Sequence, residues 1–234
     1  MSGWKPKRFW KSAQVVAEGD AFTVTLDGRP IRTPGKAPLL MPSRAMAVAV
    51  AAEWDDQGAT VDPRTMPFTR SANSAIDKVA PRRAEVAELL AAYGDADLLC
   101  YRAPEPEALV ARQAALWDPL LERAARELGA PLAPRTGVVH LPQAPEALAA
   151  LSARVHAMDP FQLAGFHDLV SLSGSLVLGF AAALDWQDPD ALWTLSRLDE
   201  LWQEEHWGAD DEAQAAAEVK RQAFLHAKRF FDAA

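Results

Sequence analysis

The spacing of apolar residues changes once along this chain, near residue 82, and that change limits the folds open to it. Before this point Phe22, Val24 and Leu26 alternate with threonines, which is the period of a half-buried strand. After it, apolar residues recur three to four positions apart through to the C-terminus, which is the helical period. We therefore expect an α+β protein, with a small N-terminal β-rich domain followed by a mainly α-helical bundle domain.

The two periods also suggest where the chain divides. Its 234 residues, half of them apolar, suffice for one large core or two smaller ones. We expect a β-rich α+β domain over residues 1–81 and a helical domain over 82–234. The second part contains one candidate strand, at 137–141, so residues 131–142 could return to the N-terminal sheet.

Local signals place the first elements. Asp27-Gly28 follows the alternating run and has the backbone freedom of a hairpin turn, so strands are expected on both sides of it. Ser43 is a suitable N-terminal cap for a helix from 44 to about 57.

Several helices are expected beyond the change of period. One covers about 109–128 and should be kinked or split by Pro119, which lacks a backbone donor. Another should run from 160 to about 184. The last begins near Asp211, and Val219 should lie on its buried side.

Residues 188–208 are the most informative stretch. Asp188 and Pro189 are typical of a helix start, and Gly208 is typical of a helix end, so one helix is expected between them. Its buried face should contain Leu192, Leu195, Leu198 or Asp199, and Trp202. The rest of its surface is rich in carboxylates and contains Trp193 and Trp207 near its ends.

A metal site is one interpretation of this helix, because Glu200 and Glu204 are four residues apart and His206 follows. The carboxylate-bridged di-iron pattern, however, needs a glutamate three residues before its histidine, and Gln203 stands there. Charge-rich helix faces are usually solvated or face a partner. We therefore expect a solvated or partner-facing acidic helix and no metal.

Composition and motifs exclude several classes of function. With 24 basic and 32 acidic residues the net charge is −8, which is unlike the basic surface that nucleic acids require. No glycine-rich phosphate-binding motif or nucleophile motif occurs, and the histidines are scattered. No cofactor is expected.

The sequence also indicates where the protein works. Its one cysteine, Cys100, excludes an intrachain disulfide and fits a reducing compartment. The apolar run 169–184 is shorter than the roughly 20 residues that span a bilayer, and residues 1–10 lack the apolar region of a secretory signal. We expect a cytoplasmic protein without membrane insertion.

The chain contains eight tryptophans, and several of them adjoin carboxylates, as in Glu53-Trp54 and His206-Trp207 near Glu204. Tryptophan is enriched at protein interfaces, although most tryptophans of a globular chain belong to its core. Both interpretations stay open for each residue.

Several motifs follow one another through nearly the whole chain: 8–11 (Arg-Phe-Trp-Lys), 26–34 (Leu-Asp-Gly-Arg-Pro-Ile-Arg-Thr-Pro), 49–57 with Glu-Trp-Asp at 53–55, 97–102 (Asp-Leu-Leu-Cys-Tyr-Arg), Gln113 with 117–120 (Trp-Asp-Pro-Leu), and 196–200 (Ser-Arg-Leu-Asp-Glu) through Gln203 to Trp207-Gly208. Their order and spacing resemble the Atp12 family, which assembles the F1 sector of F-type ATP synthase in mitochondria and related bacteria.

This resemblance implies a chaperone without enzyme activity that binds the free F1 α subunit until β subunits take its place. It implies a partner-binding role for Glu200, Gln203 and Trp207. A chaperone of this kind needs an aromatic patch with a charged rim, and Arg197, Glu53 and Trp54 could contribute to it. We expect a monomer.

Two other interpretations remain. The chain could be an enzyme with a site between its two domains, in which case a concave polar pocket should be present. It could also be a structural or regulatory subunit, which would stay bound in the finished complex.

Overall fold

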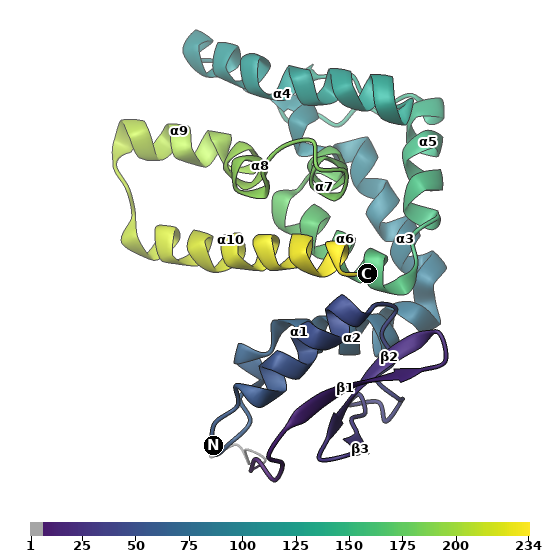
Figure 1. Cartoon of the computed structure of the whole chain (residues 1–234). Coiled ribbons are helices and arrows are strands. Elements are labelled where there is room, and N and C mark those ends of the chain that lie inside the picture. Colours follow the sequence, from purple (N-terminus) through teal and green to yellow (C-terminus); the bar gives the residue numbers. More distant parts are fainter. Residues whose placement is uncertain (1–6) are drawn as a thin grey trace. The chain divides into compact units, whose positions relative to one another are not determined.

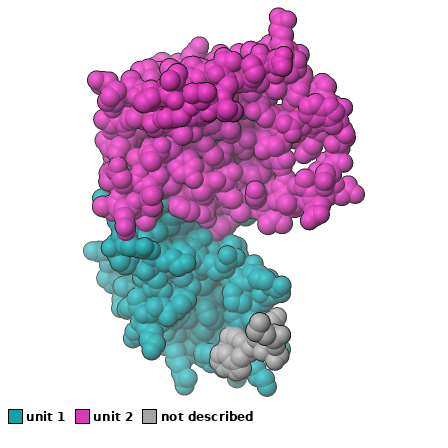
Figure 2. Space-filling model, turned by 180° about the vertical axis from the view of Figure 1, so that it is seen from behind, with its two compact units in different colours: residues 1–83, 159–165, 229–234 teal, residues 84–158, 166–228 magenta. Residues whose placement is uncertain are grey.

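The computed structural model describes residues 7–234 (Figure 1). The chain forms two compact units, shown in different colours in Figure 2. Unit 1 comprises Met1–Arg83, Asp159–Gly165 and Arg229–Ala234, and unit 2 comprises Ala84–Met158 and Phe166–Lys228. A small sheet lies in the N-terminal part and the rest is mainly helical, so the predicted α+β class is confirmed.

The sheet of unit 1 has three antiparallel strands in the order β1 (Ala13–Glu18), β2 (Ala21–Leu26) and β3 (Arg29–Pro30). Strands β2 and β3 are joined at Asp27 and Gly28, whose φ angles are 48° and 81°. Glycine adopts such a positive φ without strain, which explains the turn at this position. The predicted hairpin is confirmed.

Helix α1 (Arg44–Asp55) packs against β1 and β2. The hydroxyl of Ser43 accepts a hydrogen bond from the amide of Met46 at 3.1 Å, as the sequence predicts for a cap. Helix α2 (Pro67–Ser74) continues through a π-helical turn (Ala75–Val79) and a 3₁₀ turn (Ala80–Arg82). This segment ends irregularly, because Pro81 cannot donate to a regular helical ladder.

Unit 2 begins at Ala84, within α3 (Arg83–Ala91), and contains the parallel pair β4 (Tyr101–Arg102) and β5 (Arg135–Thr136). The strand expected at 137–141 is wrong, since strand pairing stops at Thr136 and Val138 is 90% exposed. Residues 131–142 belong to unit 2, and their strand pairs with β4 and not with the sheet of unit 1.

Helix α4 (Glu107–Leu128) runs without interruption past Pro119, so the expected split does not occur. It ends at Gly129, which has a left-handed conformation with φ of 70°. Helix α5 (Pro145–His156) follows.

The helix expected from 160 to 184 is two helices, α6 (Pro160–Ser173) and α7 (Leu176–Ala183). Gly174 ends the first with a φ of 71°, and Ser175 caps the second by accepting from the amide of Leu178 at 2.9 Å. The carboxylate of Asp97 also accepts from the amide of Val177 at 2.9 Å. Asp97, which is distant in the sequence, thus stabilises the break between α6 and α7.

The helix expected over 189–207 is likewise two helices, α8 (Pro189–Ser196) and α9 (Leu198–Trp207), and α10 (Asp211–Asp232) follows. Within α10 the expectation for Val219 is wrong, because this side chain is 72% exposed. Among the described residues, no helix combines the length and apolar character needed to cross a membrane.

Candidate partner-binding surface

The break between α8 and α9 lies at Arg197, whose φ and ψ are −113° and 20°. The indole Nε1 of Trp117 donates a hydrogen bond to the carbonyl of Leu195 at 3.0 Å, so this carbonyl is satisfied from outside the helix. The Arg197 amide closes a tight last turn on the carbonyl of Thr194 at 3.1 Å. A side chain of α4 therefore replaces the helical bond that the sequence pattern led us to expect.

Helix α4 also holds α9 in place. The buried side-chain amide of Gln113 donates to the Asp199 carboxylate at 2.7 Å. Arg112 pairs with Glu205 at 2.6 Å, and its guanidinium lies 5.9 Å from the centre of the Trp202 ring. The hydrogen bond from Arg112 lowers the pKa of Glu205. These contacts fix which side of α9 faces outward.

Two further contacts fix the side chains of α9 that do not face outward. Arg197 pairs with Glu204 at 3.2 Å, and only 16% and 22% of the two side chains are exposed. The rings of Trp202 and His206 stack with centroids 4.3 Å apart, and His206 donates from Nδ1 to the carbonyl of Trp202.

The outward side of α9 consists of Glu200, Gln203 and Trp207, which are all exposed. Trp207 is 77% exposed. Their side chains form no hydrogen bond or ion pair with any other described residue. Since a large exposed aromatic side chain beside free polar groups is typical of an interaction site, this side is the candidate partner-binding surface.

The acidic character extends from α9 into α10, which runs beside it in the opposite direction (Figure 1). Residues 198–218 include eight carboxylates and no lysine or arginine; the carboxylates are at 199, 200, 204, 205, 210, 211, 212 and 218. Nearly all residues of the first ten in α10 are exposed. This helix pair therefore presents a strongly negative surface.

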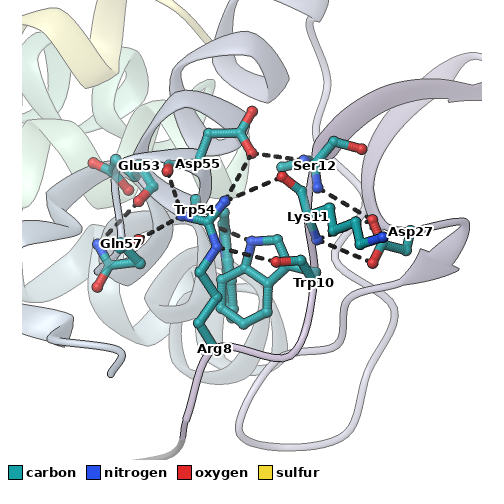
Figure 3. Close-up of polar contacts among 10 residues, drawn as sticks. Arg8, Trp10, Lys11, Ser12, Asp27, Glu53, Trp54, Asp55 and Gln57 are labelled. Atoms are coloured by element: carbon teal, nitrogen blue, oxygen red, sulfur yellow. Dashed lines mark hydrogen bonds and ion pairs between the residues drawn. The ribbon is translucent and has the colours of Figure 1, made fainter. Parts of the chain in front are cut away.

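Glu53 and Trp54 lie in unit 1, at the end of α1 (Figure 3). The Glu53 carboxylate accepts from the amides of Phe68 and Thr69, at 2.6 and 2.8 Å, and from the Thr69 hydroxyl at 2.8 Å. These are donors at the start of α2, so Glu53 acts as a cap for that helix. Burial raises the pKa of Glu53, while these hydrogen bonds act against the rise.

Trp54 is half-buried and packs edge to face against Trp10, with ring centroids 5.1 Å apart. Trp10 in turn donates from its indole to the carbonyl of Trp54 at 3.3 Å. The Trp54 indole nitrogen is itself buried and has no acceptor among the described residues. Within unit 1 this side chain is therefore part of the packing.

Figure 3 shows that Arg8 organises the same region. Its guanidinium donates to the carbonyls of Asp55 and Gln57, at 2.7 and 2.5 Å, where α1 ends. It also donates to the carbonyls of Trp10 and Lys11, at 3.1 and 3.2 Å. The cation thus satisfies carbonyls at a helix C-terminus and holds residues 8–11 beside it.

The sequence-predicted site residues are therefore divided. The structure places Glu200, Gln203 and Trp207 on α9 and Arg197 directly before it, whereas Glu53 and Trp54 belong to unit 1. Arg197 is turned inward against Glu204. The described residues contain no group of three His, Cys, Asp or Glu side chains that could hold a metal ion.

The sequence did not predict a groove between α8, α9 and α10. Trp193, Leu201, Ala217 and Arg221 line a groove there. The alanine-rich, acidic run 211–218 was one available signal, because it lacks the large apolar residues that would bury that half of α10.

Comparison with known proteins decides the family. Residues 7–125, about half of the chain, match the family described as ATP12 chaperone protein. This chain belongs to the ATP12 chaperone family. The resemblance to the chaperones of ATP synthase assembly, inferred above from sequence motifs, is thereby confirmed.

Individual proteins agree with this assignment. The ATP12-family chain is 26% identical to the mitochondrial protein atp12 of Schizosaccharomyces pombe in an alignment of 220 residues, which covers 88% of this chain and 75% of that protein. The crystal structure of Atp12 from Paracoccus denitrificans is 49% identical, covers 97% of both chains and has a TM-score of 0.94. An aspartate-to-lysine mutant of the same P. denitrificans protein matches with the same values.

Proposed function

We propose that this ATP12-family chaperone binds the unassembled F1 α subunit through the outward side of α9 and covers an interface of that subunit until β subunits displace it. We further propose that it acts as a monomer, in the cytoplasm, and without catalysing a reaction. The observation that carries the proposal is the outward side of α9, where exposed Trp207 adjoins Glu200 and Gln203.

The physical argument starts from the client. A subunit that has not met its neighbours exposes an apolar interface, and such a surface aggregates unless another protein covers it. An aromatic side chain supplies affinity, and surrounding charges disfavour wrong partners. Trp207 and the eight carboxylates of 198–218 supply these two components.

The proposed contacts assign different tasks to the six candidate residues. Glu200, Gln203 and Trp207 would touch the client. Arg197 would position α9 through Glu204, at 3.2 Å. Glu53 and Trp54 would stabilise unit 1, since their hydrogen bonds and ring contacts lie within it.

The experiment is co-expression of this chain with the F1 α subunit of the same organism, followed by size-exclusion chromatography with and without β subunit. The proposal predicts a soluble complex with the α subunit that dissociates when β is added. Aggregation of the α subunit regardless of this chain would contradict it. Retention of this chain in purified, complete ATP synthase would instead favour a structural subunit.

A further inference from the structure

The facing sides of α8, α9 and α10 enclose a groove of about 250 Å³ in unit 2. Trp193 from α8, Leu201 from α9 and Ala217 from α10 provide its apolar lining. Trp193 is 6% exposed and packs against Phe224, with ring centroids 5.8 Å apart, so this wall is anchored in the core.

Ion pairs hold the polar walls of the groove. Glu204 lies between Arg197, at 3.2 Å, and the side-chain amide of Gln214, at 3.4 Å, which connects α9 with α10. Arg221 pairs with Asp190 at 2.5 Å and with Glu218 at 3.0 Å, which connects α10 with α8. Because these charged groups are already paired, the space between them is preformed, and its apolar lining comes from Trp193, Leu201 and Ala217.

The size of the groove limits what it can hold. Sites for small-molecule ligands usually have volumes of roughly 300–1,000 Å³, whereas this groove, at about 250 Å³, is smaller and open. Pockets of this kind at protein interfaces receive a single anchoring side chain, often a large apolar one. The groove therefore fits one side chain better than a cofactor.

The charge around the groove indicates the surroundings of that side chain. Of the carboxylates on 198–218, those of Glu200, Asp211 and Glu212 form neither an ion pair nor a side-chain hydrogen bond with any described residue. They lie on the two helices that form the groove walls. A bound segment with lysine or arginine beside its anchor would be attracted, and one with carboxylates would be repelled.

We propose that this groove binds one large apolar side chain of the client, presented between basic residues. The proposal rests on the proposed function and deepens it: the outward side of α9 supplies Trp207 and Glu200, and the groove supplies the anchor pocket. Both partners then contribute apolar surface at the centre and charge at the rim, as in other specific interfaces.

The test fills the groove without changing its charge. Ala217→Trp places a large ring among Trp193 and Leu201, and Ala216→Trp, one residue away on an exposed part of the helix, is the matched control. We expect Ala217→Trp to weaken retention of the co-expressed α subunit at least about tenfold. Ala216→Trp should retain it as wild type does. Circular dichroism verifies that both variants are folded.

A peptide probe keeps this proposal separate from the identity of the client. A fluorescent amphipathic helix made of leucine and lysine should bind the wild-type chain, and its leucine-glutamate counterpart should not. Ala217→Trp should abolish the binding, and added salt should weaken it. Equal binding of the lysine peptide to wild type and to Ala217→Trp would contradict the groove as a binding site. Undiminished α-subunit retention by that variant would contradict it as well.

The outcomes distinguish a failure of the groove proposal from a failure of the proposed function. Loss of α-subunit binding in Ala217→Trp alone supports both the client and the groove. Undiminished binding in that variant leaves the proposed function standing and removes the groove. If wild type does not retain the α subunit, the proposed function fails, and the lysine peptide still decides whether the groove accepts a basic, apolar segment.

Discussion

Gln113 and Asp199 are joined by a hydrogen bond of 2.7 Å between the side-chain amide and the carboxylate. Gln113 is fully buried, and its side-chain oxygen also accepts from the amide of Ala103 at 2.9 Å. Consecutive residues of a helix point in different directions. Since Asp199 faces α4, its neighbour Glu200 faces outward, and two adjacent carboxylates have different environments.

Replacing Gln113 should destabilise the fold. In Gln113→Leu the Ala103 amide and the Asp199 carboxylate both lose their partner, and one buried unsatisfied group costs about 1–3 kcal/mol. Urea unfolding should show a lower free energy of unfolding by that amount. Gln203→Leu, an exposed change on α9, should stay within roughly 0.5 kcal/mol of wild type. Equal stabilities of the two variants would refute the buried network.

Charge reversal at positions 199 and 200 should separate folding from binding. Glu200→Lys leaves every described contact intact, so its unfolding curve should match wild type within roughly 0.5 kcal/mol. Its retention of the α subunit should fall, and the loss should shrink at high salt because the effect is electrostatic. Asp199→Lys should instead unfold more easily, since it places a cation beside the buried Gln113. Normal client retention by a folded Glu200→Lys variant would count against α9 as the binding surface.

Arg8 should stabilise unit 1 through the shape of its side chain as well as its charge. Arg8→Lys keeps the cation but cannot reach the four carbonyls that the guanidinium contacts. We expect the free energy of unfolding to drop by about 1–2 kcal/mol. Arg44→Lys at the exposed start of α1 is the control, and a similar small effect of both changes would show that the network contributes little.

The carboxylate of Asp97 should make stability depend on pH. It is fully buried and accepts from Ser175 Oγ at 2.7 Å and from the amides of Leu99 and Val177, at 3.0 and 2.9 Å. Burial raises the pKa of Asp97 from 3.8 to about 6, even though these hydrogen bonds favour the charged form.

The direction of the effect follows from proton binding. Between about pH 4 and pH 6 the folded chain keeps a proton on Asp97 that the unfolded chain has released, so the free energy of unfolding falls as pH rises. The total contribution is roughly 2–4 kcal/mol. Asp97→Asn should remove this part of the slope in urea unfolding measured across that range. Asp20→Asn, at an exposed turn, controls for the loss of one carboxylate, and an Asp97→Asn slope equal to wild type would contradict the argument.

Elements governed by local signals could be predicted from the sequence. The hairpin at Asp27-Gly28 and the helix capped by Ser43 depend on residues next to them in the chain, and both formed as expected. The breaks after Ser173 and Ser196 could not be predicted, because Asp97 and Trp117 stabilise them from distant positions. Periodicity alone continues across such breaks.

The candidate site could be predicted only in part from the sequence, for the same reason. The carboxylates of α9 were expected to be solvated or to face a partner, and Glu200 and Glu205 are exposed, whereas Asp199 and Glu204 are half-buried against α4 and Arg197. The exposure of Trp207 was left open by the sequence. The capping role of Glu53 could not be predicted from the sequence, because its three hydrogen-bond donors belong to Phe68 and Thr69, fifteen or more residues away. A carboxylate beside a tryptophan has the same local sequence whether it caps a helix or faces a partner.

Trp207 allows a test in which a large side chain can be removed with little effect on the fold. It is 77% exposed at the end of α9, so Trp207→Ala should change the free energy of unfolding by less than roughly 0.5 kcal/mol. Trp193→Ala, which empties a buried site in the same unit, should lower the free energy of unfolding by about 3–5 kcal/mol.

If Trp207 anchors the client, its removal should reduce α-subunit retention by about tenfold or more, as for an interface hot spot, and Trp207→Phe should restore part of it. Size-exclusion chromatography of the co-expressed pair measures this retention. Full retention by a stable Trp207→Ala variant would leave the exposed ring without a role in binding, and the acidic residues of α9 and α10 would then have to account for the interaction by charge alone.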